Sequence, residues 1–280
     1  MRKLKKVKFM FMVSALFLVF SSMVQYPGLA HDALAAEKDQ GSKVTGEQGS
    51  DIDQEALAIL KKATDYLTGL TQFRLKGYKD EDALQESGQK FQFSASFEVC
   101  LKRPNRLFVT RMEDDGIIRR LWYDGKTASM YDEGEKVYAQ IPVPDTIDTM
   151  LDYLETVIES PLPLADLLYN DLSHLSERAL SGRYVDVSFV QNTACDHLAF
   201  RGESVDWQFW IDRGEKPLIR KIVITYKELP GEPQLSGRLE EWNTEPKISD
   251  TLFQFSTPEG ARRIPIVGSK RRDSKEGGAQ

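Results

Sequence analysis

The sequence is poor in the residues that most often carry chemistry. Its 280 residues include two cysteines, Cys100 and Cys195, and three histidines, His31, His174 and His197. Neither of the two later histidines has metal-ligand spacing with a cysteine. The chain also lacks the G-x-S-x-G, P-loop and G-x-G-x-x-G motifs that mark nucleophilic and nucleotide-binding sites. We therefore expect no catalytic residue, no metal and no cofactor.

The two cysteines allow more than one interpretation. In an exported protein Cys100 and Cys195 could form a disulfide, but sequence spacing alone does not bring them together. Two separate, half-buried thiols are the simpler interpretation. Cys195 and His197 are two residues apart on one strand, so a Cys/His nucleophile of a hydrolase is conceivable. A packed strand is the simpler interpretation of that pair as well.

A long apolar run lies near the N-terminus. The first eight residues, MRKLKKVK, hold five basic residues and no acid, and the apolar stretch FMFMVSALFLVF follows directly. Small residues come next, which predicts a secretory signal peptide over residues 1–35, cleaved after Ala35 or, as a second choice, after Ala30. An uncleaved anchor is less favoured because the apolar run is short for a membrane span of about 20 residues.

Without residues 1–35, the chain would hold 32 basic and 42 acidic residues, a net charge near −10. This acidic balance argues against a nucleic-acid partner. It also gives no electrostatic help to binding an anionic membrane surface. The sequence therefore predicts an exported protein, periplasmic or secreted, that recognises its partners by other means.

The composition divides the remaining chain into a leader, a folded domain and a tail. Residues 36–52 and 268–280 are polar and rich in glycine and serine, which predicts a flexible leader and a disordered tail. The folded domain is expected over 53–267. It opens with a helix that Asp53 caps and Gly69 ends. The apolar face of this helix holds Ala56, Ile59, Leu60, Ala63, Leu67 and Leu70.

Alternating apolar and polar residues then predict strands. The clearest is KFQFSASFEVCLKR at 90–103, in which every second residue from Phe91 to Leu101 is apolar. About eleven such segments, joined by turns, predict a mainly β (α+β) fold: a curved antiparallel sheet that forms an incomplete barrel. The other strands are expected near 72–79, 105–113, 117–123, 126–131, 136–141, 183–190, 195–201, 205–212, 217–227 and 234–243.

A helical insertion interrupts the strands over 145–172. Pro161 and Pro163 divide it, and Pro163 can begin a second short helix. The apolar residues of the first helix are Ile147, Met150, Leu151, Leu154, Val157 and Ile158, and those of the second are Leu164, Leu167 and Leu168.

Several strands are apolar on both faces. In VDWQFWID, residues 205–212, Trp207 lies on the apolar face, whereas Trp210 interrupts the polar face. A second buried surface, covered by the inserted helices or by a ligand, would explain this pattern. The simpler interpretation is that tryptophans at strand positions belong to the core.

Several segments resemble the periplasmic lipoprotein-carrier superfamily, the LolA/LolB type. The resemblance rests on FEVCLKRPNRLFV (97–109), YDGKTASMYDEGEKVY (123–138) and SDTLFQFSTPEGA (249–261), and SPLPLADLLYND loosely matches the lid helix of that family. The segments CDHLAF and DWQFWID look like an uncharacterised family of predicted secreted or periplasmic proteins with the same fold.

The resemblance implies a helical lid over an apolar cavity that receives lipid or an acylated lipoprotein. It also implies that Arg103, at the position of the arginine in the Lys-Arg-Pro-Asn motif, helps to hold the lid shut. The function expected is that of a non-catalytic carrier, a monomer with possible partners in the cell envelope. The cavity-lining candidates are Phe93, Phe97, Trp122, Leu164, Leu167, Trp207 and Trp210.

Two other functions remain open. The helices could fill the concave face permanently, which would make the protein an interaction or structural module of the cell envelope. A hydrolase is the weakest alternative because it needs Cys195, His197 and a carboxylate within hydrogen-bond reach in one polar cleft.

Overall fold

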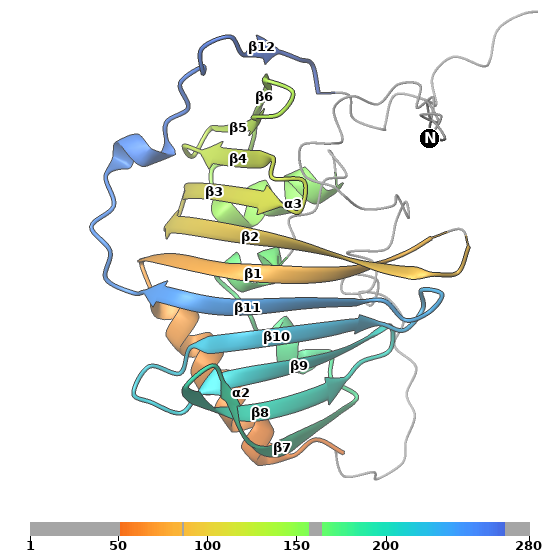
Figure 1. The fold of residues 1–280 in the computed structure, drawn as a ribbon. Helices are drawn as coiled ribbons and strands as arrows, with labels where there is room; N and C mark the ends of the chain where they lie inside the picture. Colours follow the sequence, from red (N-terminus) through yellow and green to blue (C-terminus); the bar gives the residue numbers. More distant parts are fainter. Residues whose placement is uncertain (1–50, 86, 157–163, 267–280) are drawn as a thin grey trace, which may run out of the picture.

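The computed structural model of the protein describes residues 51–85, 87–156 and 164–266. Within these ranges the chain forms a single twelve-stranded sheet with a few helices on one of its faces (Figure 1). The expected signal peptide and tail, and the expected roles of Val157, Ile158, Pro161 and Pro163, lie outside the described residues.

The sheet consists of two meanders that meet at its centre. Its strand order is β12-β6-β5-β4-β3-β2-β1-β11-β10-β9-β8-β7, and every pair is antiparallel except the parallel pair of β12 and β6. Strands β12 and β7 lie at opposite edges, so the curved sheet stays open rather than closing into a barrel. The strands are β1 (Gln72–Leu84), β2 (Lys90–Lys102), β3 (Arg106–Glu113), β4 (Ile118–Tyr123), β5 (Thr127–Asp132), β6 (Val137–Pro142), β7 (Ser181–Val190), β8 (Thr193–Arg201), β9 (Val205–Asp212), β10 (Ile219–Tyr226), β11 (Gln234–Asn243) and β12 (Arg262–Arg263).

The first described helix, α2 (Gln54–Gly69), begins and ends where the sequence predicts. The Asp53 side chain accepts a hydrogen bond from the backbone N–H of Glu55 at 2.8 Å, which satisfies a donor that the first helical turn leaves free. The backbone hydrogen bonds that Asp53 accepts from Glu55 and Tyr184 lower its pKa. The buried side of the helix, formed by Ala56, Leu60, Ala63, Thr64 and Leu67, faces the sheet.

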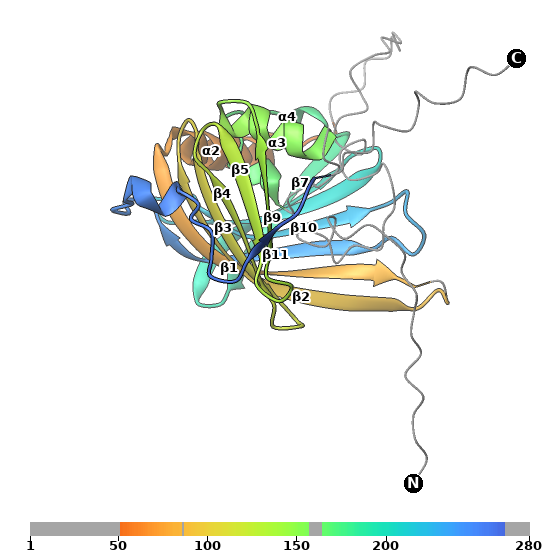
Figure 2. The ribbon, with the colours of Figure 1, turned by 90° about the horizontal axis from the view of Figure 1, so that it is seen from above.

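The helices lie together on the concave face of the sheet (Figure 2). Besides α2 these are α3 (Ile147–Thr156), the 3-10 helix η2 (Ala165–Leu168) and the short α4 (His174–Glu177). Their apolar residues join those of the strands in one hydrophobic core, the arrangement that covers one face of an antiparallel sheet. None of the described helices has the length and apolar character needed to span a membrane.

The sequence predicted this architecture well. The eleven long strands, the N-terminal helix and the helical insertion are confirmed, and the fold is mainly β with an open, curved antiparallel sheet. Three small elements were missed: α4, the 3-10 helix η3 (Asp250–Phe253) and β12. Each is four residues or shorter, which is too short for a periodic apolar pattern to reveal.

Gly77 occupies a position in β1 where another backbone comes unusually close. The register between β1 and β11 shifts next to this residue. A Cβ atom built on Gly77 would lie 2.2 Å from the carbonyl oxygen of Arg238 and 2.8 Å from the Phe97 ring. We expect Gly77→Ala to lower the free energy of unfolding by about 2 kcal/mol, because the backbone at Arg238 must move to make room for the Cβ atom. Urea unfolding would measure this, with Gly69→Ala, where a Cβ meets no atom within 4 Å, as the control.

Candidate functional site

Arg103 lies directly after β2 and contacts two helical segments at once. Its Nε donates to the carbonyl oxygen of Leu70, the C-cap of α2, at 3.2 Å. Its Nη1 donates to the Leu168 carbonyl at 2.9 Å and to Asn170 Oδ1 at 2.7 Å, and its Nη2 donates to the Tyr169 carbonyl at 3.2 Å. The planar guanidinium thus ties the end of α2 and the end of η2 to the rim of the sheet.

Helix α3 holds the same segment from the other side. Asp148 accepts hydrogen bonds from the backbone N–H of Asn170 at 3.2 Å, and Asp152 accepts one from the Tyr169 hydroxyl at 2.8 Å. Burial and this carboxylate together raise the pKa of the Tyr169 phenol. The chain from η2 to Asn170 is therefore clamped between Arg103 and α3. Asp148 and Asp152 could not be predicted as partners, because nothing in the sequence around them indicates this contact.

The charge of Arg103 is solvated without being neutralised. In the described part of the chain, no carboxylate lies within the 4.0 Å of an ion pair with its guanidinium. Burial lowers the pKa of the guanidinium, while Asp148 acts in the opposite direction. An arginine remains charged under these conditions, so its positive charge is met by neutral oxygen atoms.

Five of the cavity-lining candidates face the helices or belong to them. Trp207 and Leu167 are buried in the core, and Phe97 packs against it. Leu164 lies over Gly237 so closely that a Cβ on the glycine would come within 2.6 Å of its Cδ1 atom. Phe93 lies on the same face as Phe97 but is 37% exposed.

The other two candidates, Trp122 and Trp210, lie on the opposite, convex face, so their interpretation as cavity-lining residues is wrong. The Trp210 ring stacks on His197 with centroids 4.1 Å apart, and Lys221 lies over it at 4.4 Å. These partners sit opposite Trp210 on β8 and β10. Cross-strand stacking and a cation–π contact explain why a tryptophan interrupts the polar face.

Trp122 has a different covering on the convex face. Its ring contacts that of Phe108 on β3, with centroids 5.5 Å apart, and that of Phe255, with centroids 5.2 Å apart. Phe255 belongs to the C-terminal segment that leads from η3 to β12 and also contacts Tyr138. The second apolar face of β4 is thus buried by the chain itself.

The cysteines do not form the disulfide that was considered. Cys100 and Cys195 are both free and buried. They lie on β2 and β8, which four other strands separate, a distance of about 24 Å at the usual strand spacing. Burial raises the pKa of Cys100 to about 11 and also raises that of Cys195.

The Cys195/His197 pair does not have the surroundings of a nucleophile and its base. Burial keeps the Cys195 thiol protonated, whereas a catalytic cysteine needs a lowered pKa. His197 is engaged by Gln208 at 2.9 Å and by the Trp210 ring. Among the described residues, no group of three or more potential metal ligands is present.

A row of buried charges on the concave face went unnoticed in the sequence. Arg119 Nη1 lies 2.6 Å from Glu113 Oε2, and Arg119 Nε lies 2.9 Å from Asp132 Oδ2. Arg111 also pairs with Glu113, and all four side chains are less than 10% exposed. The available signal was that Arg111 and Arg119 occupy the alternate positions that elsewhere on β3 and β4 hold buried Leu107 and Leu121.

The helices α3, η2 and α4 together form a helical cover on the concave face (Figure 2), and His174 on α4 adds a pH dependence to it. Burial lowers the pKa of His174, and the positive charge of Arg178 lowers it further. The carboxylates of Asp166, at 3.8 Å, and Asp171 act in the opposite direction. The folded protein therefore favours neutral His174, and this contribution to stability is present above the ordinary pKa of about 6.5 and is lost as the pH falls below it.

We expect the stability of the wild type to fall more steeply than that of His174→Gln between pH 7 and pH 5. The difference should be at most about 1.4 kcal/mol per pH unit. Urea unfolding at a series of pH values measures it, and parallel curves for the two proteins would contradict the prediction.

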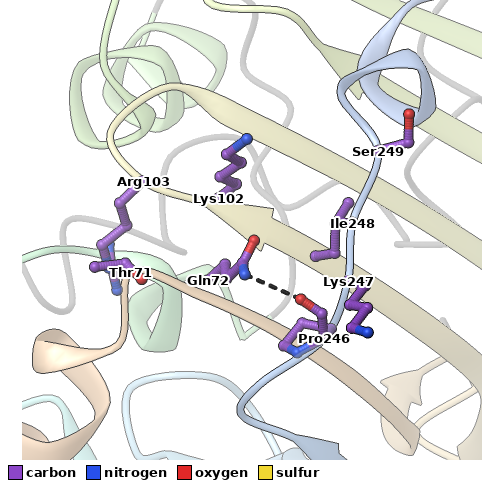
Figure 3. A pocket seen from close by; sticks show the side chains of 8 residues that line it. All are labelled: Thr71, Gln72, Lys102, Arg103, Pro246, Lys247, Ile248 and Ser249. Carbon is purple, nitrogen blue, oxygen red and sulfur yellow. Dashed lines mark hydrogen bonds between the residues drawn. The ribbon is translucent and has the colours of Figure 1, made fainter.

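An open groove of about 630 Å³ lies beside Arg103 on the rim of the sheet (Figure 3). Gln72 Nε2 donates to the Pro246 carbonyl at 2.9 Å, which fixes the C-terminal segment against β1. Lys102 pairs with Asp250 of η3 at 2.6 Å. The groove is lined by Thr71, Gln72, Lys102, Arg103, Pro246, Lys247, Ile248 and Ser249.

Three solved structures show a distant likeness to this fold. The Mycobacterium tuberculosis lipoprotein LppX is 12% identical with a TM-score of 0.41, covering 69% of this chain and 97% of its own. LprF from Mycobacterium bovis is 13% identical with a TM-score of 0.45, covering 76% and 100%. The LolA superfamily protein NE2245 from Nitrosomonas europaea is 10% identical with a TM-score of 0.33, covering 71% and 97%. Likeness at these values does not establish a shared cargo or activity.

A search of curated protein sequences found no match. A family model does match, over residues 56–267, which takes in α2 from its third residue onward, α3, η2, α4 and every strand of the sheet. This match confirms the resemblance of CDHLAF and DWQFWID to an uncharacterised family of periplasmic proteins. The chain belongs to the family described as Predicted periplasmic protein (DUF2092).

Proposed function

We propose that this protein is a non-catalytic periplasmic carrier that binds lipid or acylated cargo on the concave face of its sheet. The observation that supports this most directly is the way the helical cover is attached. Its apolar side chains pack on the sheet, while its end is held by polar contacts that Arg103 and α3 provide. If these hydrogen bonds broke and acyl chains took over the contacts of the buried leucines, the segment would be free to move and would expose apolar surface.

Acyl chains would replace the contacts that the cover now makes. Leu167 and Leu168 are buried against the sheet, and Leu164 lies over Gly237. Burial of apolar surface is non-directional and contributes roughly 25 cal/mol per Å², so an alkyl chain can substitute for leucine side chains. In this proposal Arg103 holds the lid closed, and Phe93, Phe97 and Trp207 contact the cargo.

The periplasmic location follows from two kinds of support. The family carries the description of a predicted periplasmic protein. The N-terminal sequence has the basic start, apolar run and small residues of a signal peptide. Cleavage would release the domain, with its acidic net charge, into the periplasm.

A second candidate function is that of an envelope interaction module whose concave face never opens. It is favoured by the packing of α2, α3, η2 and α4 into the same hydrophobic core as the strands. A hydrolase is disfavoured, because the Cys195 thiol is buried and His197 is engaged by Gln208 and Trp210.

Native mass spectrometry of exported protein, followed by organic extraction, tests the proposal. We expect a lipid or acyl peptide to co-purify with the wild type and with Trp210→Glu, whose side chain lies on the convex face. Leu167→Glu should lose this cargo because it places a charge beneath the cover. A clean apo mass that does not change on exposure to lipid would instead favour the interaction module.

A further inference from the structure

The groove beside Arg103 gathers positive charge in a protein that is acidic as a whole. Lys102, Arg103 and Lys247 line it together, although the full chain has a net charge of −6. These residues come from the end of β2 and from the segment after β11, which the topology brings together (Figure 3). The fold, and not one basic stretch of sequence, therefore places three cationic side chains around the groove, with their charged ends turned apart from one another (Figure 3).

The positive charge of the groove is only partly balanced. Lys102 is neutralised by Asp250, but Arg103 meets only neutral oxygen atoms within its hydrogen-bonding distance. Lys247 is exposed, and across the described ranges it forms no ion pair. The charge of Lys247 and part of that of Arg103, on which the Asp148 carboxylate also acts, are thus left to attract an anion into a groove large enough for a small polar group.

We propose that this groove binds a phosphate-bearing headgroup, and that binding releases the helical cover. This inference rests on the proposed function as a lipid carrier. An arginine fork together with a lysine is a favourable combination for phosphate oxygens. Arg103 already makes charge-assisted hydrogen bonds to backbone carbonyl oxygens, and a phosphate adds the attraction of a full negative charge. A phosphate in the groove therefore competes with the carbonyl oxygens of Leu168 and Tyr169 for the donors of Arg103.

Leu168 connects the binding of the headgroup to the release of the helical cover. Its carbonyl oxygen accepts a hydrogen bond from Arg103, and its side chain is buried in the core beneath the cover. A headgroup on Arg103 would thus place its acyl chains next to the apolar surface that η2 covers. This short path favours a lipid headgroup over an acidic peptide, which has no apolar chain to insert there.

Coupling between the two sites is reciprocal. If phosphate draws Arg103 away from the residues that follow η2, opening of the cover must in turn strengthen phosphate binding. The carrier would then stay closed in the absence of a headgroup and open where one is presented.

Isothermal titration with dihexanoylphosphatidic acid, below its micelle concentration, tests the binding step. We expect Lys247→Glu to weaken the Kd by about tenfold, as loss of one charge-assisted contact predicts. The control Lys62→Glu, an equally exposed lysine on α2, should leave the Kd unchanged. Inorganic phosphate should bind more weakly but with the same dependence on Lys247, and dihexanoylglycerol should not depend on Lys247 at all.

Hydrogen exchange tests the release step. The backbone amide of Asn170 donates a hydrogen bond to Asp148. It should exchange faster when dihexanoylphosphatidic acid is bound. Equal Kd values for both lysine variants, unchanged exchange at Asn170, or tighter binding of hexaglutamate than of the lipid would each overturn the inference. If acyl cargo still co-purifies in that case, only this inference fails; if no acyl compound binds either, the proposed function fails with it.

Discussion

Replacement of Arg119 by methionine is expected to lower the free energy of unfolding by about 4 kcal/mol. The Arg119 guanidinium lies between Glu113 and Asp132, and the three side chains are 8%, 9% and 3% exposed. Methionine keeps most of the volume but removes the charge that both carboxylates face. Two buried acids would then have to be desolvated without this partner, which is why breaking a buried ion pair costs far more than the pair contributes.

The neighbouring Arg120 offers a matched control. It points to the other face of β4 and pairs with Glu133 at 2.9 Å, with side chains 29% and 48% exposed. Arg120→Met should cost less than about 1 kcal/mol, because water replaces the partner. Urea unfolding of the two variants at pH 7 measures the difference. Equal losses would mean that the row of buried charges is open to solvent.

Arg103→Lys is expected to lose about 3 kcal/mol of the free energy that keeps the cover closed. Lysine keeps the positive charge, but its single ammonium group cannot reach the carbonyls of Leu70, Leu168 and Tyr169 in the fork geometry of arginine. Partly buried carbonyl groups would be left without donors. Hydrogen exchange at the Asn170 amide reports the opening directly, and it should become faster by about two orders of magnitude.

The control for Arg103 is its neighbour Lys102. Lys102→Ala removes an ion pair with Asp250 whose side chains are 39% and 66% exposed, so the opening of the cover should change by less than about 1 kcal/mol. If exchange at Asn170 in Arg103→Lys matched that of the wild type, the hydrogen bonds of Arg103 would not be what keeps the cover closed. A lid role for this residue would then be untenable.

The parts of the fold that the sequence predicted are those set by local chemistry. Asp53 can be read as an N-cap because capping depends only on the adjacent turn. The strand from Phe91 to Leu101 can likewise be predicted from the sequence, because the alternation of apolar and polar residues is a local pattern. Arg103 was singled out by a resemblance in its motif, whereas its partners Asn170 and Asp148 could not be, since they come from a distant segment.

The errors arose where strand register matters. Alternation already placed Trp210 opposite Trp207, yet only pairing with β8 and β10 shows that His197 and Lys221 enclose its ring. For Cys100 and Cys195 the simpler interpretation, two separate thiols, is confirmed, although only the strand order shows that four strands lie between them. The register of a strand pair depends on both strands and the turn that joins them, and the strand order depends on the whole sheet, so no single segment encodes either.

The pairing of β1 with β11 decides how the sheet can be assembled. Strands β1 to β6 and strands β7 to β11 each pair with their sequence neighbours, so both meanders involve short loops that close quickly. The seam between them joins residues as distant as Lys76 and Glu241, and such a closure carries the largest loss of chain entropy. A chain cut short before β11 would keep the contacts within its first meander but would lose the seam. The fold can therefore be completed only after the last long strand has been synthesised.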